Sequence, residues 1–187
     1  LKPNMDYPYA AEKAEVDRMF QQFADHNPDI GVTTGRTVAV VGPGAGASGL
    51  NILFMPVMLK VCGRNPAWQF IHEEDLAEWV VRLLRGRHGG VYNLAGEGGM
   101  PYRDMIQALE KPSVSLPSGL LYHAVRAAWR LRLQSKGPAG GLNMLEYPIL
   151  LDTRKARQAT GYEPVYSSEQ AFQSFLQERN GEKAGTA

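Results

Sequence analysis

Apolar side chains recur along the chain with two different periods, and these periods predict helices and strands in turn. Residues 8–27 place Val16, Phe20 and Phe23 at helical spacing, with charged residues between them, which predicts an amphipathic helix. The pattern then changes to the β-favouring run GVTTGRTVAVV at 31–41, which predicts a strand that leads into a glycine loop. Alternation of strands and helices is typical of α/β proteins.

The rest of the chain continues this alternation. One helix boundary is marked by chemistry, because Asp75 is a plausible N-cap and Glu78 three residues later completes a capping box. The final residues, 179–187, are polar and are expected to form a disordered tail. The other predicted elements are strands at 68–72, 89–96 and 113–117, and helices at 50–61, 75–87, 102–110, 118–133, 152–162 and 167–179.

Composition indicates an ordinary globular protein of 187 residues. The net charge of +1 gives no reason to expect nucleic acid as a partner. A single cysteine, Cys62, cannot form an internal disulfide, so a cytoplasmic setting is expected. The longest apolar run, LNILFMPVML, is too short to span a bilayer and contains Pro56, so the run does not favour a membrane protein. The four histidines lack ligand spacing with Cys62, which argues against a metal site.

The glycine loop raises a specific question about dinucleotide binding. Gly44, Gly46 and Gly49 form G-x-G-x-x-G directly after a predicted strand. Glu73 and Glu74 follow Gly49 at about the twenty-residue separation at which a dinucleotide fingerprint carries its ribose-binding acidic residue. Pro43 stiffens the loop, and a lone G-x-G-x-x-G motif is weak. Two interpretations follow: a pyrophosphate cradle, or a glycine-rich loop that lines a cleft.

A second motif stands near the start of the chain. YAAEK puts Tyr9 and Lys13 on one face of the predicted helix, one turn apart. A nearby ammonium favours the ionised form of a phenol, which suits a tyrosine for proton transfer. On its own this spacing is a weak signal.

Five motifs in order carry a family resemblance. YAAEK is followed by GRTVAVVGPG, FIHEEDLAEWVV, GGVYNLAGEG and LDTRKARQATGYEP. This series resembles the C-terminal half of the extended short-chain dehydrogenase/reductase superfamily, in its NAD-dependent epimerase/dehydratase branch. The resemblance extends from Tyr7 to about Leu176.

The resemblance implies roles for particular residues. Tyr9 corresponds to the catalytic acid/base, and Lys13 to the partner that holds the nicotinamide ribose. Thr37 and Val38 correspond to contacts of the strand end with the nicotinamide. The glycine loop then belongs to the substrate side, where Gly42, Pro43 and Gly44 match the G-P-G turn of the family.

The resemblance also bears on the substrate. Ala39 stands where members acting on nucleotide sugars often carry asparagine, which puts a nucleotide-sugar substrate in doubt. The apolar run LNILFMPVML favours a less polar substrate instead. His72 occupies the histidine position of the family's H-x-x-D and is a candidate substrate contact, whereas the alternative is that His72 braces a turn and Asp75 caps the next helix.

The resemblance predicts the C-terminal part of a Rossmann-type doubly wound sheet plus a small α/β substrate-binding lobe. The expected domains are 1–95, with an inserted substrate loop at 42–74, and a lobe at 96–178. In the family the dinucleotide loop precedes the catalytic tyrosine, so the chain is expected to be a fragment of an NAD- or NADP-dependent parent enzyme. The fragment alone is expected neither to bind the dinucleotide tightly nor to turn over a small-molecule substrate.

An alternative function is a non-catalytic interaction module. The predicted helix at 118–133 places Leu121, Val125, Trp129 and Leu133 on one face, with arginines beside them, which suits a membrane surface or a partner. The simpler interpretation is a lobe helix that buries this face. An exposed half-sheet would also favour homo-oligomers or self-association.

Overall fold

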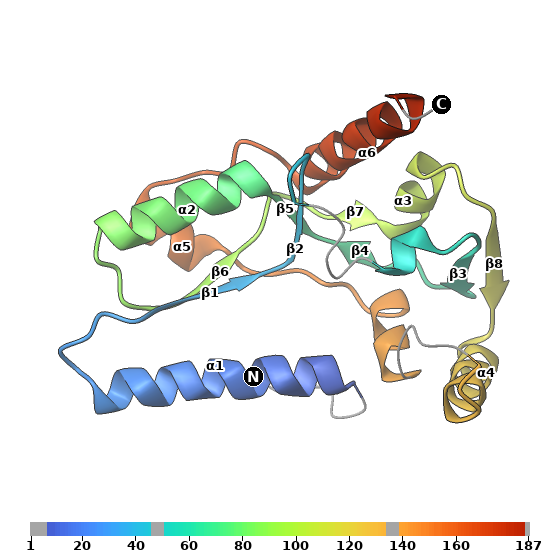
Figure 1. The fold of residues 1–187 in the computed structure, drawn as a ribbon, viewed down its shortest axis with the longest axis horizontal. Helices are drawn as coiled ribbons and strands as arrows, with labels where there is room; N and C mark the ends of the chain where they lie inside the picture. Colours follow the sequence, from blue (N-terminus) through green and yellow to red (C-terminus); the bar gives the residue numbers. More distant parts are fainter. Residues whose placement is uncertain (1–6, 46–50, 134–138, 186–187) are drawn as a thin grey trace.

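A computed structural model describes residues 7–45, 51–133 and 139–185, and these residues form an α/β fold (Figure 1), as predicted. Most helices begin and end within a few residues of the predicted positions. The elements in chain order are α1 (Pro8–His26), β1 (Thr33–Thr37), β2 (Ala39–Val41), the 3-10 turn η1 (Asn51–Phe54), β3 (Met58–Val61), β4 (Ala67–Trp68), β5 (Phe70–His72), α2 (Glu73–Arg85), β6 (Gly90–Leu94), β7 (Met100–Pro101), α3 (Tyr102–Ala108), β8 (Ser113–Leu116), α4 (Ser118–Arg130), the 3-10 segment η2 (Ala139–Leu145), α5 (Arg154–Thr160) and α6 (Ser168–Gly185).

The strands pair two by two, and three of the four pairs are parallel. β1 pairs with β6, β2 with β5, and β3 with β8, whereas the short β4 and β7 are antiparallel. Helix α2 connects β5 of one parallel pair to β6 of another. Within the described residues, β1 has β6 as its one strand partner.

The single strand predicted at 31–41 is two strands. The chain changes partner at Val38, because β1 pairs with β6 up to Thr37 and β2 pairs with β5 from Ala39 onward. Val38 is buried, and its amide donates a hydrogen bond to the carbonyl of Leu94 over 3.4 Å. This partner change brings the ends of four strands close to one another.

The hydrophobic core has two parts on opposite sides of β5. Successive side chains of a strand point to opposite faces, and Phe70 and Ile71 are both fully buried. Phe70 packs in a cluster with Val41 and Phe172, and Ile71 packs in a second cluster with Trp79. β5 is therefore covered on both faces, as is typical of strands in parallel sheets.

Helix α6 covers the Phe70 side of β5. The buried Ser168 hydroxyl accepts a hydrogen bond from the Phe70 amide over 3.2 Å, and the rings of Phe70 and Phe172 lie 5.1 Å apart. The helix continues to Gly185, beyond the predicted helix end at residue 179, and the disorder of the tail stays a prediction. Residues 186–187 lie outside the described part of the chain.

Two further predictions are wrong in detail. Instead of a helix at 50–61, the structure has η1 followed by strand β3, whose partner β8 comes from a segment more than fifty residues later. Helix α4 ends at Arg130 rather than at residue 133. In the part of the chain that the structure describes, no helix is long and apolar enough to cross a membrane.

Helix α1 runs beside β1 in the opposite direction (Figure 1), and a charged pair joins the two elements. The Arg36 guanidinium donates to both carboxylate oxygens of Asp17, over 2.8 and 2.7 Å. Asp17 is nearly buried, whereas the apolar side chains Val16, Phe20 and Phe23 are about half exposed. The polar pair, and not the apolar stripe that predicted the helix, is thus the buried contact of α1.

This pair predicts a pH dependence of stability. Hydrogen bonds from Arg36 hold the pKa of Asp17 below its ordinary value of about 3.9. A lowered folded-state pKa adds stability above the unfolded value, and this stability is lost as the pH falls through the folded pKa. We therefore expect the difference in melting temperature between the natural protein and Asp17→Asn to shrink below about pH 4. Thermal unfolding from neutral to strongly acidic pH measures this difference.

The matched control for this prediction is Glu15→Gln. Glu15 also pairs with an arginine, Arg18, but both side chains are more than half exposed. An exposed pair of this kind contributes little to stability. A difference for Asp17→Asn that stays constant with pH, or that matches the Glu15→Gln profile, would contradict the assignment.

Candidate functional site

Tyr9 and Lys13 lie together in the first turns of α1, as their spacing predicted. The Lys13 Nζ atom lies 5.6 Å from the centroid of the Tyr9 ring. The Tyr9 side chain is 54% exposed, and the ring of Tyr7 stands 5.8 Å away. A phenol beside an ammonium is thus open to an incoming molecule.

The start of α1 borders η2. A Cβ atom added at Gly141 would come within 3.5 Å of the Tyr7 ring. The pKa of Tyr7 is raised above its ordinary value. Burial is the larger cause, and the electrostatic effect of the neighbouring Tyr9 is the smaller one. The surroundings of the Tyr9–Lys13 pair therefore include a segment some 130 residues later in the chain.

The strand residues expected at the cofactor lie in different environments. Thr37 ends β1 opposite Leu94 and is exposed, whereas Val38 is buried in the cluster that contains Ile71. Ala39 begins β2 opposite Phe70 and is half-buried. Ligands of open α/β sheets bind beyond the carboxyl ends of the strands. Thr37 is the last residue of β1, and its contact with a nicotinamide stays a prediction.

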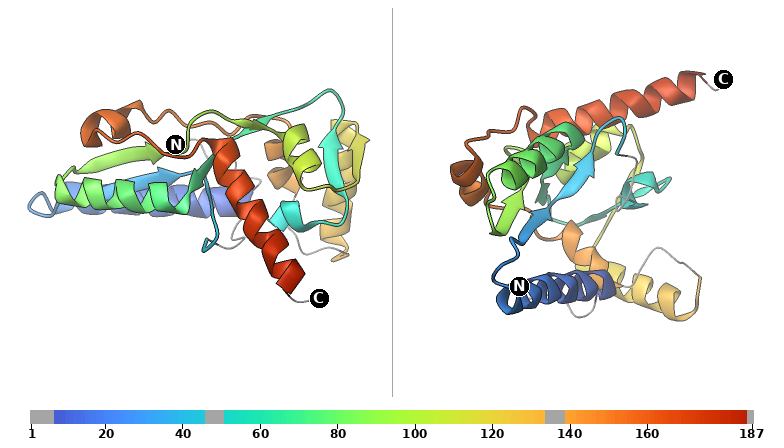
Figure 2. Two further views of the ribbon diagram at one scale, coloured as in Figure 1. Left: turned by 90° about the horizontal axis from the view of Figure 1, so that it is seen from above. Right: turned by 60° about the vertical axis from the view of Figure 1, so that its left-hand side comes forward.

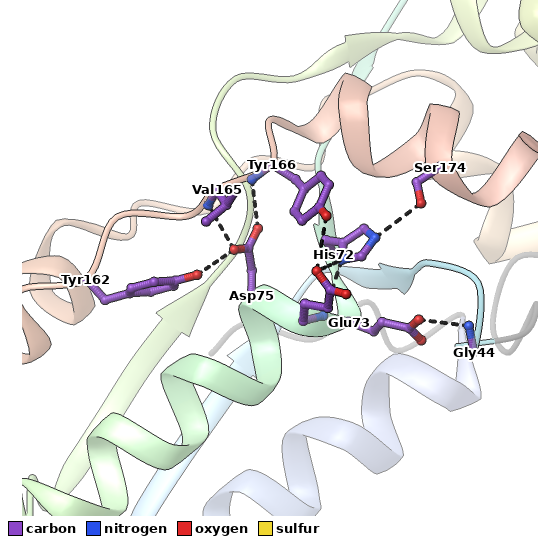
Figure 3. Close-up of polar contacts among 9 residues, drawn as sticks. Gly44, His72, Glu73, Asp75, Tyr162, Val165, Tyr166 and Ser174 are labelled. Atoms are coloured by element: carbon purple, nitrogen blue, oxygen red, sulfur yellow. Dashed lines mark hydrogen bonds and ion pairs between the residues drawn. The ribbon is translucent and has the colours of Figure 1, made fainter.

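The turn after β2 is tied to the start of α2. Gly44 donates its amide to the Glu73 Oε1 atom over 2.8 Å (Figure 3). Gly42 has a φ of +151°, and a Cβ there would lie 2.8 Å from the Glu73 carboxyl carbon. Glycine at position 42 thus lets the turn approach this carboxylate closely. The other motif glycines, Gly46 and Gly49, and the question of a pyrophosphate cradle that depends on them, lie outside the described residues.

His72 caps helix α2, a role that the sequence interpretation assigned to Asp75. Its Nδ1 accepts a hydrogen bond from the Glu74 amide over 3.3 Å, and its Nε2 lies 3.2 Å from the Ser174 hydroxyl. Its ring stacks on Tyr166 at 3.8 Å, and the side chain is 2% exposed (Figure 3). The proposed contact of His72 with substrate stays a prediction.

Asp75 is not the cap but the anchor of the loop before α6. Its buried carboxylate accepts hydrogen bonds from the Tyr162 hydroxyl at 2.6 Å, the Val165 amide at 2.8 Å and the Tyr166 amide at 3.0 Å (Figure 3). Burial, together with this hydrogen bond, raises the pKa of Tyr162. The anchor holds Tyr166 against His72.

The structure therefore brings the predicted residues together in two groups. Tyr9 and Lys13 form one group, and Gly42, Gly44 and His72 meet around the start of α2. Among the described residues, no hydrogen bond or ion pair joins the two groups. Sequence reasoning considered Glu73 only as a ribose contact and missed its hydrogen bond to the substrate-side turn. Three acidic residues at a helix start signal favourable interaction with the helix dipole, but not which carboxylate turns toward the glycines.

These features define the class of protein. Parallel strand pairs linked by a helix, together with a tyrosine and a lysine one turn apart on a helix, are typical of Rossmann-type dehydrogenases of the short-chain type. The family model "NAD dependent epimerase/dehydratase family" matches residues 2–95. The chain belongs to this family.

Solved structures of related enzymes share the fold. The dTDP-glucose 4,6-dehydratase DesIV from Streptomyces venezuelae, with NAD and TYD bound, is 18% identical and superposes with a TM-score of 0.66 over 99% of this chain and 54% of its own length. RMD from Pseudomonas aeruginosa, complexed with NADPH, is 16% identical with a TM-score of 0.59 over 91% of this chain and 55% of its own. This likeness confirms the Rossmann-type fold class.

A curated relative gives the extent of the match. The uncharacterized protein y4nG of Sinorhizobium fredii is 30% identical over 155 residues, which cover 73% of this chain and 38% of that protein. The chain spans less than half the length of the curated relatives that it matches.

Proposed function

We propose that this chain carries the proton-transfer pair and the substrate-side turn of an NAD(P)-dependent oxidoreductase or epimerase. The observation that carries the proposal is the Tyr9–Lys13 pair, with Nζ 5.6 Å from the ring centroid and the phenol exposed. Membership of the family and the nicotinamide complexes of the structural relatives support the reaction class.

In this proposal Tyr9 exchanges a proton with the substrate at a carbon–oxygen centre. When a hydroxyl is oxidised, its proton passes to the Tyr9 oxygen as the carbon loses a hydride; in the reverse direction Tyr9 protonates the carbonyl oxygen. A bound nicotinamide would accept or supply that hydride. Lys13 and Thr37 are the residues of this chain that would hold it, since Lys13 neighbours Tyr9 and Thr37 is exposed at the end of β1.

The substrate would meet the turn at 42–44. Glu73 fixes this turn through the Gly44 amide, so the turn presents a defined surface beside β2. The dehydratase DesIV acts on a nucleotide sugar, but Ala39 replaces the asparagine expected for such substrates. The apolar run does not decide the matter, because Leu53 and Met58 are fully buried in the core instead of facing a ligand.

We further propose that this chain alone holds the dinucleotide weakly. The pyrophosphate loop of the family precedes the catalytic tyrosine, and the structural relatives are matched over about half of their length. We expect a titration of the chain with NADH or NADPH to show no saturable quenching of Trp68, Trp79 and Trp129 at micromolar concentrations.

Free N-acetyltryptophanamide, titrated in parallel, corrects for light absorbed by the nucleotide. Saturable micromolar quenching above this control would show that the chain has a dinucleotide site of its own. The reaction class is tested separately, on the polypeptide that the gene encodes at its natural length. That polypeptide should either reduce NAD⁺ or NADP⁺ with a secondary alcohol, or, with the cofactor present, convert a sugar nucleotide to a new product without net reduction of the cofactor. Failure of both reactions with both cofactors across such a panel would refute the proposed class.

A further inference from the structure

The segment 111–145, which contains α4 and η2, has one sign of charge. It holds five lysines and arginines (Lys111, Arg126, Arg130, Arg132 and Lys136) and none of the 19 acidic residues of the chain. The whole chain is nearly neutral, so this cationic segment is a local feature. The proposed hydride chemistry uses none of these five residues.

Helix α4 buries only the beginning of its apolar face. Leu121 is 2% exposed, but Trp129 is 43% exposed and Leu133, just past the helix end, is 75% exposed. The simpler interpretation of this helix, a lobe helix with a buried apolar face, therefore holds for its first turns alone. Figures 1 and 2 show α4 at the edge of the molecule, next to η2, so its C-terminal end faces outward.

The arginines of α4 form no ion pair within the part of the chain that the structure describes. Arg126 and Arg130 lie one turn apart and, with His123 and Leu131, line a shallow groove of about 460 Å³. Among the described residues no carboxylate forms an ion pair with either arginine, whereas Arg36 and Arg157, for example, are both paired. A groove of two unpaired guanidinium groups is suited to phosphate groups.

We propose that α4 binds the surface of an anionic phospholipid bilayer. The guanidinium groups of Arg126 and Arg130 would meet lipid phosphates, while Trp129, Leu131 and Leu133 enter the headgroup region. Tryptophan favours this interface, and a cationic helix with exposed apolar residues binds in the interface plane. The proposal goes beyond the proposed function and does not depend on it.

The same features argue against two other partners. Nucleic acid would satisfy the arginines but would leave the exposed Trp129, Leu131 and Leu133 without apolar surroundings. A second copy of α4 would bring arginines of like charge together, without acidic residues to pair with them. An anionic bilayer offers both the charge and the apolar interior.

The test is co-sedimentation of the chain with vesicles of phosphatidylcholine, alone or mixed with phosphatidylglycerol. We expect binding to the mixed vesicles, little binding to phosphatidylcholine alone, and a decrease with added salt. The variant Arg126→Gln/Arg130→Gln should bind the mixed vesicles about 30-fold more weakly, because each cation near an anionic surface contributes about fivefold.

The matched control is Arg85→Gln/Arg87→Gln, which removes the same charge from two exposed arginines near the end of α2. This control should bind as the natural chain does. Leu131→Ser/Leu133→Ser tests the apolar contribution beyond the helix, and circular dichroism checks that each variant is folded. Absence of binding to the mixed vesicles, or equal losses in the two arginine variants, would overturn the proposal.

Discussion

Replacing Tyr9 by phenylalanine is expected to lower the turnover of the natural-length polypeptide by a factor of about 10² to 10⁴. The substitution removes the hydroxyl that would exchange a proton with the substrate and leaves the ring in place. Because Tyr9 is exposed and makes no hydrogen bond within the described structure, its loss should leave the fold unchanged. Steady-state kinetics with the cofactor and substrate that the natural polypeptide uses measure the effect.

Tyr7→Phe is the matched control for this experiment. Tyr7 also lies at the start of α1, with its ring 5.8 Å from that of Tyr9, but the proposal gives it no part in proton transfer. Lys13→Met should lower turnover as well, and it should raise the KM for the cofactor, since Lys13 would hold the ribose. Equal losses in Tyr7→Phe and Tyr9→Phe would assign the effect to the packing of α1, and an active Tyr9→Phe variant would refute the role of the phenol.

Replacing Asp75 by alanine is expected to lower the free energy of unfolding by about 3–5 kcal/mol. The substitution leaves three donors without their acceptor: the Tyr162 hydroxyl and the amides of Val165 and Tyr166. Each such donor costs about 1–3 kcal/mol when it stays buried and unpaired. Because the loop that loses its anchor also places Tyr166 against His72, the start of α6 should loosen. Chemical denaturation measures the free energy, and hydrogen exchange of the 162–166 amides measures the loosening.

Two milder variants make this prediction sharper. Asp75→Asn keeps the shape of the side chain but directs an amide donor at one of the three donors, so it should be of intermediate stability. Tyr162→Phe removes one of the three hydrogen bonds and should cost about 1 kcal/mol. An Asp75→Ala protein as stable as Tyr162→Phe would show that Asp75 does not anchor the loop.

Helices that are determined by their own residues could be predicted from the sequence. Helix α1 was predicted between Pro8 and Asn27 and spans Pro8–His26. Its apolar stripe identified it as a helix, but the stripe did not identify its contact, which is the Asp17–Arg36 pair. Periodicity reports local conformation, whereas the partner of a helix depends on residues elsewhere in the chain.

Elements that depend on distant residues were predicted poorly. The apolar segment 50–61 fits both a helix and a strand, and its pairing with β8 decides in favour of strand β3. Asp75 satisfies the rule for a capping box, but its carboxylate is taken by donors that lie 87 to 91 residues later. In both cases a long-range contact overrides a local preference.

The candidate site was likewise predictable only where it depends on residues that are close together in the sequence. The Tyr9–Lys13 pair is local and could be identified from one motif. The link between Gly44 and Glu73 spans 29 residues and depends on the pairing of β2 with β5, which puts the ends of these strands side by side. A sequence alone does not show this link, because the pairing of strands in a sheet cannot be inferred from the spacing of its motifs.

The anchor at Asp75 also has a consequence for the synthesis of the protein. A ribosome adds about 5–20 residues per second, so the donors at Tyr162 and Tyr166 are made about 5–20 s after Asp75. During this interval the nascent helix α2 carries an acidic group that cannot yet be enclosed with its partners, and α6 is not available to cover β5. The middle of the chain therefore reaches its final packing only after α6, which begins at Ser168, has been translated, and a chaperone that binds nascent chains would find β5 uncovered until then.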